Sequence, residues 1–147
     1  MEQATEYVPS DEELRSILDD AKTIAVVGLS SKPHRDSHGV ARYLQRAGYR
    51  IVPVNPKESD VLGERAYSTL ADIPSDVEID VVDVFRRAED TPPIAQAAAD
   101  RGAKVLWLQD GIVNDESRAI AEGAGLTVVM GTCMMREHQR LESEDER

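Results

Sequence analysis

The segment at residues 28–39, GLSSKPHRDSHG, brings together the groups that proteins commonly use to bind phosphate. Its hydroxyl and basic side chains are Ser30, Ser31, Lys32, Arg35 and Ser37. Hydrogen bonds from charged donors to phosphate oxygens are short and strong. A helix is expected to begin near Ser37 or His38, and its free amides and dipole favour an anion. The segment therefore predicts a phosphate site at the start of a helix.

The dinucleotide fingerprint Gly-x-Gly-x-x-Gly is absent from this segment, because the next glycine after Gly28 is Gly39. A site for NAD also needs an acid after the second strand to bind the ribose hydroxyls. Here the second expected strand, YRIVPV, is followed by NPK, so Lys57 stands near the position of the acid. A lysine suits a ribose phosphate, as in NADP or coenzyme A. Asn55-Pro56 is also typical of a simple turn.

The sequence gives no catalytic residue and no metal site. Cys133 and His138 are five residues apart in an expected helix, which turns them about 140° from each other. Cys133 is the single cysteine, which excludes an internal disulfide and a zinc site of several thiolates. Its place near a helix start favours a thiolate, whereas the alternative is a buried packing residue. The histidines at 34 and 38 contact phosphate or face water.

Charged residues surround IDVVDVF, which is expected to be the third strand. Asp80 and Asp83 are interpreted as strand-edge polarity and a turn rather than as acid–base machinery. Arg86 and Arg87 follow the strand and predict either a phosphate clamp or an ion pair with the acids at 89 or 90.

Composition narrows the class of protein further. The chain has 147 residues, a net charge of −11 and 41% hydrophobic residues, which is typical of one globular domain. The acidic balance argues against nonspecific nucleic-acid binding. We expect a cytoplasmic protein, since there is no apolar run of about 20 residues and no secretion signal near the N-terminus. The acidity suggests either adaptation to a salty cytosol or an ordinary acidic protein.

Basic residues concentrate in one segment of this acidic chain. Residues 21–57 contain seven basic residues and one acid, Asp36. This distribution indicates a local anionic ligand. Arg42 and Arg46, four residues apart, are interpreted instead as the exposed face of a helix.

The elements that must position these groups alternate along the chain. Five buried strands are expected at TIAVVG, YRIVPV, IDVVDVF, AKVLWLQ and LTVVM, with helices between them and at both ends. Alternation of this kind predicts an α/β, Rossmann-like three-layer fold, with a five-stranded parallel sheet in the order 3-2-1-4-5 and helices on both faces. We expect a single domain over 1–147, frayed at 1–9 and 142–147. Ligands bind such sheets at the carboxyl ends of the strands.

Several motifs in order resemble the small single-domain CoA-binding proteins, relatives of the N-terminal CoA-binding domain of the succinyl-CoA synthetase alpha subunit. The motifs are GLSSKPHRDSHGVA, VNP, DVFRR, LQDG and GLTVVMGTCMMREHQRL, and the resemblance runs from about Lys22 to Leu141. It implies a fold that holds coenzyme A or an acyl-CoA across the strand ends. Ligase activity is not implied, because a phosphohistidine domain and a nucleotide-grasp subunit are not among these residues.

The resemblance assigns candidate contacts to each part of coenzyme A. Contacts to the phosphates would come from Gly28, Ser30, Ser31 and Lys32, with Arg35, Ser37 and His38 beside them. The adenosine and its 3′-phosphate would meet Pro53, Asn55 and Lys57. The adenine or pantetheine side would be lined by Val84, Phe85 and Arg86, and the pantetheine end by Gln109 and Gly111.

The function expected from the sequence is that of a non-catalytic module that binds CoA or acyl-CoA, with a protein partner or a homo-oligomer as further possibilities. Two alternatives stay open. One is an NADP-binding, oxidoreductase-like protein, and the other is a thiol-redox or CoA-disulfide sensor that uses Cys133.

Overall fold

Five parallel strands form the central sheet of the computed structural model, which describes residues 5–145. In the order of the sheet the strands are β2 (Arg50–Val54), β1 (Thr23–Val27), β5 (Val81–Val84), β6 (Val105–Leu108) and β7 (Thr127–Met130). A separate antiparallel hairpin consists of β3 (Asp60–Val61) and β4 (Glu64–Arg65).

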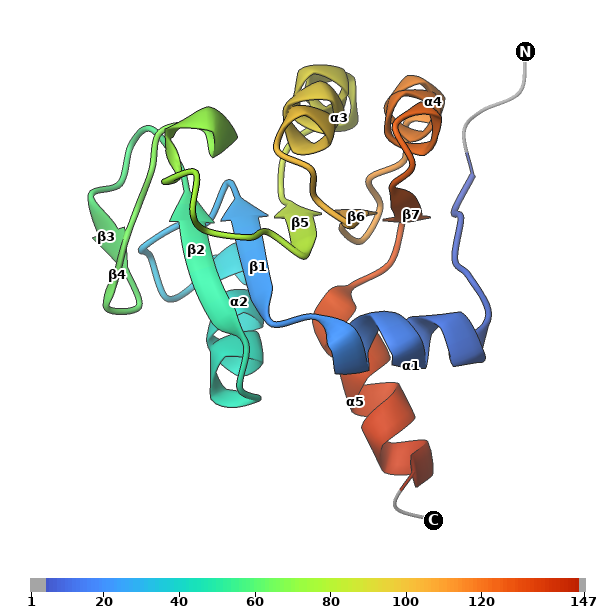
Figure 1. Cartoon of the computed structure of the whole chain (residues 1–147). Helices are drawn as coiled ribbons and strands as arrows, with labels where there is room; N and C mark the ends of the chain where they lie inside the picture. Colours follow the sequence, from blue (N-terminus) through green and yellow to red (C-terminus); the bar gives the residue numbers. More distant parts are fainter. Residues whose placement is uncertain (1–4, 146–147) are drawn as a thin grey trace.

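Helices cover both faces of the sheet, as Figure 1 shows. Helices α1, α2 and α5 lie on one side, and α3 and α4 lie on the other. Their bounds are α1 (Asp11–Asp20), α2 (Asp36–Arg46), α3 (Thr91–Asp100), α4 (Asp115–Gly123) and α5 (Met134–Asp145). Two short 3₁₀ turns are present at Leu70–Asp72 and Ala88–Asp90. The expected three-layer α/β class and the five parallel strands are confirmed.

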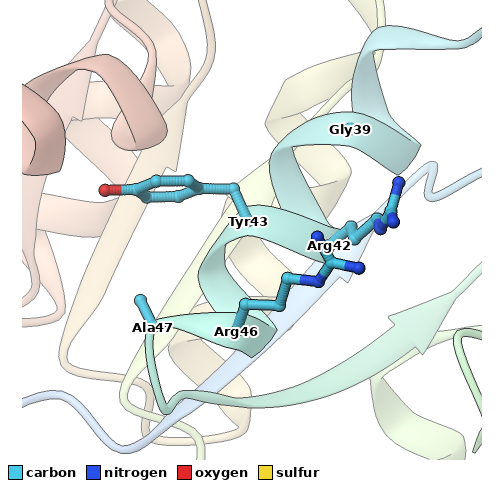
Figure 2. Close-up of a pocket in the computed structure, with 5 residues that line it drawn as sticks. All are labelled: Gly39, Arg42, Tyr43, Arg46 and Ala47. Carbon is cyan, nitrogen blue, oxygen red and sulfur yellow. The ribbon is translucent and has the colours of Figure 1, made fainter.

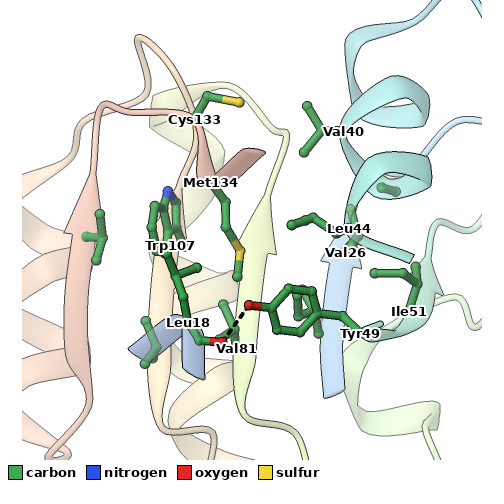
Figure 3. Close-up of a cluster of buried hydrophobic side chains, with 14 of the residues drawn as sticks. Leu18, Val26, Val40, Leu44, Tyr49, Ile51, Val81, Trp107, Cys133 and Met134 are labelled. Carbon is green, nitrogen blue, oxygen red and sulfur yellow. Dashed lines mark hydrogen bonds between the residues drawn. The ribbon is translucent and has the colours of Figure 1, made fainter. Parts of the chain in front are cut away.

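The residues of β1 show how the sheet serves two cores. Successive side chains of a strand point to opposite faces. Ile24 and Val26 pack with Leu44 and Trp107 beneath α1, α2 and α5, part of the cluster in Figure 3. Ala25 and Val27 join a second cluster with α3 and α4. A strand buried on both faces reads as a continuous apolar run, which is the pattern of TIAVV.

The order of the strands differs from the expected 3-2-1-4-5. Strand β5, the third of the five along the chain, pairs with β1 rather than lying outside β2, so the order is 2-1-3-4-5. Pro53 gives the reason. The carbonyl of Pro53 accepts a hydrogen bond from Tyr67 N at 3.0 Å on the outer side of β2, and its ring nitrogen has no proton for a full ladder there. Proline is confined to edge strands for this reason.

Side-chain caps position the helices largely as the sequence indicates. Ser10 accepts from Glu13 N at 3.2 Å, and Asn114 accepts from Ser117 N at 2.8 Å. Such caps satisfy amides that lack helical partners. The helix that the sequence predicts to begin near Ser37 or His38 begins at Asp36, and Arg35, not Ser37, occupies the cap position.

The end segments that we expected to be frayed take part in the fold where the structure describes them. Tyr7 forms an antiparallel bridge with Met130, and α5 continues to Asp145. Arg15 pairs with Glu144 at 3.1 Å and with Asp145 at 3.2 Å. The parts of that expectation that concern 1–4 and 146–147 lie outside the described residues.

Two features are absent from residues 5–145. No helix there is both long enough and apolar enough to cross a bilayer. Within the same residues, no three side chains among histidine, cysteine, aspartate and glutamate gather as a metal site would require.

Candidate functional site

The carboxyl ends of β1 and β5 meet at the point where the chain changes direction across the sheet. From β1 the chain moves outward to β2, and it then returns to β5 on the other side of β1. Ligands bind open parallel sheets at such a switch point. Under the expected order, the switch point would lie between Gly28 and Gln109. The observed order puts Phe85 beside Gly28 instead.

Gly28 is required by this close approach. Its φ is +89°, and a Cβ at this position would lie 2.5 Å from the backbone oxygen of Phe85. A side chain would therefore push β1 and β5 apart at their ends. Gly28 is therefore needed for the close approach of β1 and β5, even though the Gly-x-Gly-x-x-Gly pattern is absent.

A hollow of about 960 Å³ opens at this edge of the sheet. It contains ten of the fifteen predicted binding residues: Gly28, Ser30, Ser31, Lys32, Arg35, Ser37, Asn55, Lys57, Phe85 and Arg86. Its volume is in the range of small-molecule sites. We call it the first hollow.

Positive charge predominates in the first hollow. Four cations line it, from Lys32, Arg35, Lys57 and Arg86, together with two carboxylates, Asp36 and Glu58. Glu58 is engaged with the loop, since Ser31 N donates to its Oε2 at 2.8 Å and this bond lowers the pKa of the carboxyl. The remaining excess of cations suits an anion.

The serines of the loop hold its shape and still keep hydroxyl protons to donate. Ser37 Oγ accepts from Ser30 N at 3.0 Å, and Ser30 Oγ accepts from Lys32 N at 3.1 Å. In both bonds the hydroxyl is the acceptor, so its own proton stays available. Ser37 therefore links the loop to the first turn of α2 rather than capping that helix.

Asn55 connects the loop to the end of β2. Its Nδ2 donates to Leu29 O at 3.0 Å, and its Oδ1 accepts from Lys57 N at 3.0 Å. The second bond is the turn that the sequence indicates at this position. Since both ends of the amide are used, Asn55 holds Lys57 and the loop in place.

The two arginines after β5 have different surroundings. Arg86 lines the first hollow, whereas Arg87 pairs with Asp90 at 3.2 Å and lies 3.6 Å from Glu89. The sequence predicted either an ion pair or a phosphate clamp for these two arginines. Arg87 forms the ion pairs, and Arg86 is the one available to a ligand.

A second hollow of about 650 Å³ adjoins the first and shares four lining residues with it, His34, Arg35, Asp36 and Phe85. Apolar groups are more prominent here. They come from Pro33, Val40, Ile112, Cys133 and Met135. The predicted Gln109 lines this second hollow, and Asp110 and Arg136 pair beside it at 2.5 Å.

Four predicted binding residues line neither hollow. They are His38, Pro53, Val84 and Gly111. Pro53 and Val84 are buried within their strands. His38 belongs to the first turns of α2, and Gly111 forms a turn with φ of +73°.

Other residues of the two hollows are absent from the sequence prediction. The charged ones are Asp36, Glu58, Asp110 and Arg136. Asp36 and Glu58 each lie beside predicted residues in the chain, which is the signal that could have found them. Arg136 comes from α5 and joins the site only through the tertiary fold.

Cys133 packs in the core just before α5. It is 4% exposed and belongs to the cluster of Figure 3, near Trp107 and Met134. Burial raises the pKa of its thiol, although the amides of Arg136 and Met135 act in the opposite direction. The packing interpretation is favoured, because a buried thiol with a raised pKa is a poor nucleophile.

His138 does not face Cys133, as the helical geometry predicts. Its Nδ1 lies 2.7 Å from the hydroxyl oxygen of Tyr43, which joins α5 to α2. The pair is therefore not a nucleophile and base.

Asp83 corrects the interpretation of the third strand. It lies within β5, not at its edge, and its side chain is fully buried. Gln109 Nε2 donates to Oδ1 at 2.5 Å, and no described residue bonds to Oδ2. Burial raises the pKa of this carboxyl to about 7, against the opposing effect of the Gln109 bond.

A further hollow, of about 440 Å³, lies on α2 alone (Figure 2). Its lining is Gly39, Arg42, Tyr43, Arg46 and Ala47. Arg42 and Arg46 are both exposed, which confirms their interpretation as the outer face of a helix. None of the predicted binding residues belongs to this surface.

The fold and the paired hollows define an α/β domain of the doubly wound class with an open site at its switch point. Residues 22–139 match the family model described as a CoA binding domain. The chain belongs to this CoA-binding family, as its motifs predict.

Individual relatives agree with this membership. The chain is 45% identical over 130 residues to the uncharacterized protein YneT of Bacillus subtilis, covering 88% of this chain and 95% of that protein. A hypothetical protein from Pyrococcus horikoshii OT3 has a solved structure with a TM-score of 0.89 and 43% identity, covering 97% of this chain and 99% of that one.

A more distant match concerns a much longer protein. It is the alpha subunit of the ADP-forming acetate–CoA ligase I of Pyrococcus furiosus, 31% identical over 91 residues. The match covers 58% of this chain and 19% of that subunit.

Proposed function

We propose that this chain binds coenzyme A or an acyl-CoA across the two hollows and catalyses no reaction itself. The observation that carries the proposal is the pairing of a cation-rich hollow with a more apolar one at the switch point. Coenzyme A has the matching two-part chemistry, with an anionic nucleotide end and a long neutral arm. The family supports a CoA-binding module in general, and the ligand itself is our proposal.

The first hollow suits the nucleotide end. The loop at 28–37 offers amides, hydroxyl protons and cations to the diphosphate. Lys57, held by the Asn55 turn at the end of β2, is the group we assign to the 3′-phosphate. An acid there would repel that phosphate.

The second hollow suits the pantetheine arm. Phe85 lines both hollows and so gives an apolar surface from one to the other. The arm has apolar methyl and methylene groups and two amides, which match a wall that combines apolar side chains such as Val40, Ile112 and Met135 with polar ones such as Gln109.

The non-catalytic character and the cytoplasmic location are parts of the same proposal. Cys133, which lines the second hollow, is buried. The ligase activity of the Pyrococcus furiosus relative is not assigned to this chain, because the match covers 19% of that subunit.

Calorimetry with matched ligands tests the proposal. The wild-type chain should bind CoA more tightly than 3′-dephospho-CoA. Lys57→Ala should weaken CoA binding by about tenfold and remove the preference, because a charge-assisted contact to phosphate is lost. Arg46→Ala removes an exposed cation on α2 outside both hollows, and it should leave both affinities unchanged. Absence of CoA binding at millimolar concentration would overturn the proposal.

Two further measurements test the alternative functions, an NADP-binding protein and a thiol sensor. A thermal shift with NADPH that exceeds the shift with CoA would favour the NADP reading. Rapid alkylation of Cys133 in the native protein would favour the thiol sensor. The burial of Cys133 and the raised pKa of its thiol count against the second of these.

A further inference from the structure

Asp83 is a carboxyl group that the fold does not explain. It is fully buried in the middle of the central strand, and its Oδ2 has no partner among the described residues. Burying such a group without a partner destabilises a fold. Buried polar groups left unsatisfied in a native structure call for a functional explanation.

The one hydrogen bond of Asp83 leads to the proposed ligand site. Gln109 Nε2 donates to Asp83 Oδ1 at 2.5 Å, and Gln109 also lines the second hollow. An ionised carboxylate can only accept hydrogen bonds. If Oδ2 is protonated, Oδ1 still accepts. The hydrogen bond in the structure, with Oδ1 as the acceptor, therefore turns the nitrogen of the amide toward Asp83.

This orientation leaves Oε1 of Gln109 as the atom available to a ligand. Among residues 5–145, the hydrogen bond of the Gln109 side chain is made through Nε2, and none is donated to Oε1. A free amide that lined the hollow could rotate and present a donor or an acceptor. Asp83 removes this choice, so the hollow presents an acceptor and selects a ligand group that donates.

We propose that Asp83 is a positioning residue that fixes the Gln109 amide so that its oxygen accepts an N–H of the pantetheine arm. The inference rests on the proposed function and assigns a recognition element to the arm. The buried carboxyl acts through Gln109 and does not touch the ligand. Pantetheine has two amide N–H groups, and these are the donors that such an acceptor would bind.

The test compares CoA with 3′,5′-ADP, which keeps the nucleotide end and lacks the arm. Asp83→Asn removes the fixed polarity, because the new side chain carries a donor as well as an acceptor and can bond to either end of the Gln109 amide. The Kd for CoA should rise by about three- to tenfold, the usual effect of weakening one hydrogen bond. The Kd for 3′,5′-ADP should stay within about twofold.

Two further variants distinguish a positioning role of Asp83 from a purely structural one. Gln109→Leu should produce the same selective loss, and Asp83→Asn should have no added effect in that background. Asp80→Asn is the matched control at the other end of the strand and should change the affinity for neither ligand. Gln109→Leu also keeps the test decisive if Asp83→Asn does not fold.

Equal weakening of CoA and 3′,5′-ADP by Asp83→Asn would overturn the inference, since a structural role moves both. So would an unchanged affinity for CoA. If the wild-type chain bound 3′,5′-ADP but CoA no more tightly, the arm would have no site, and the inference would fail while a nucleotide site remained. If the wild-type chain bound neither ligand, the proposed function would fail and the inference with it.

Discussion

Asp80 lies just before β5 and Asp83 lies within it, three residues further along the chain, and their carboxyl groups have opposite surroundings. Asp80 Oδ2 accepts from Lys22 N and Thr23 N, each at 2.9 Å, and Oδ1 lies 3.2 Å from Lys104 Nζ. Asp83 has one bond and an unpartnered oxygen. Burial raises the pKa of both, but the partners of Asp80 outweigh burial and lower its pKa overall.

The contrast between Asp80 and Asp83 extends to the two edges of the sheet, formed by the amino ends and by the carboxyl ends of the strands. At the amino edge, Asp80 joins the start of β1 to β5 and pairs with Lys104. At the carboxyl edge, strand ends, cations and an unsatisfied carboxyl surround two open hollows. The satisfied carboxylate lies at the first edge, and the groups that we propose to bind a ligand lie at the second.

Removal of the Asp80 carboxylate should give the largest loss of stability. Asp80→Ala leaves the buried amide of Thr23 and the partly buried amide of Lys22 without this acceptor, so the free energy of unfolding should fall by about 2–3 kcal/mol. Urea unfolding measures this loss. Lys104→Ala, which removes only the exposed partner, should cost much less. Equal losses in the two variants would contradict the account of the amino edge.

A side chain at Gly28 should disturb the carboxyl edge. Gly28→Ala combines a positive φ with a backbone clash at 2.5 Å, and we expect a loss of about 1–3 kcal/mol together with weaker CoA binding. Gly125→Ala is the control, because its φ is +88° and a Cβ would meet nothing within 4 Å. Urea unfolding and calorimetry should show the larger loss and the binding defect only at Gly28. Matching results for the two variants would mean that close packing of β1 and β5 is unimportant.

The dependence of stability on pH should distinguish the two aspartates. The folded pKa of Asp83, about 7, is raised above 3.8, so the unfolded chain ionises first and stability falls as the pH rises from about 4 to about 7. The lowered pKa of Asp80 has the opposite effect, since its contribution is lost as the pH falls below about 4.

Asp83→Asn isolates the first of these two effects. Its midpoint of thermal unfolding should lose the decline that the wild type shows between pH 4 and pH 7. The difference between the two proteins should be constant above about pH 7. A difference that did not change from pH 4 to pH 8 would show that Asp83 is not held in its neutral form.

Much of the first hollow could be predicted from the sequence, because most of its residues are close together in the chain. The loop at 28–37 and the segment 55–57 supply eight of the ten predicted residues in the first hollow: Gly28, Ser30, Ser31, Lys32, Arg35, Ser37, Asn55 and Lys57. Their polarity and turn propensities act locally, so a pattern of residue types was enough to find them.

The structure departs from the sequence predictions where distant segments meet. Val84 and Gly111 follow the rule that strand ends bind ligands, but neither lines the first or the second hollow, and their ligand contacts stay predictions. The strand order was wrong because periodicity does not say which neighbours a buried strand will have. The proline at 53 was the available signal, since it favours an edge position for β2.

The sequence by itself determined the class of fold, the five buried strands and the basic phosphate-type loop, because burial periodicity and local polarity are properties of short segments. Only the tertiary structure decided that β5 lies beside β1 and that Phe85 therefore meets Gly28. It also decided that Asp83 is buried under Gln109. Pairing of strands and burial of a charge depend on what surrounds a residue in space, and residues from α5 and the ends of β5 and β6 come together only in the folded chain.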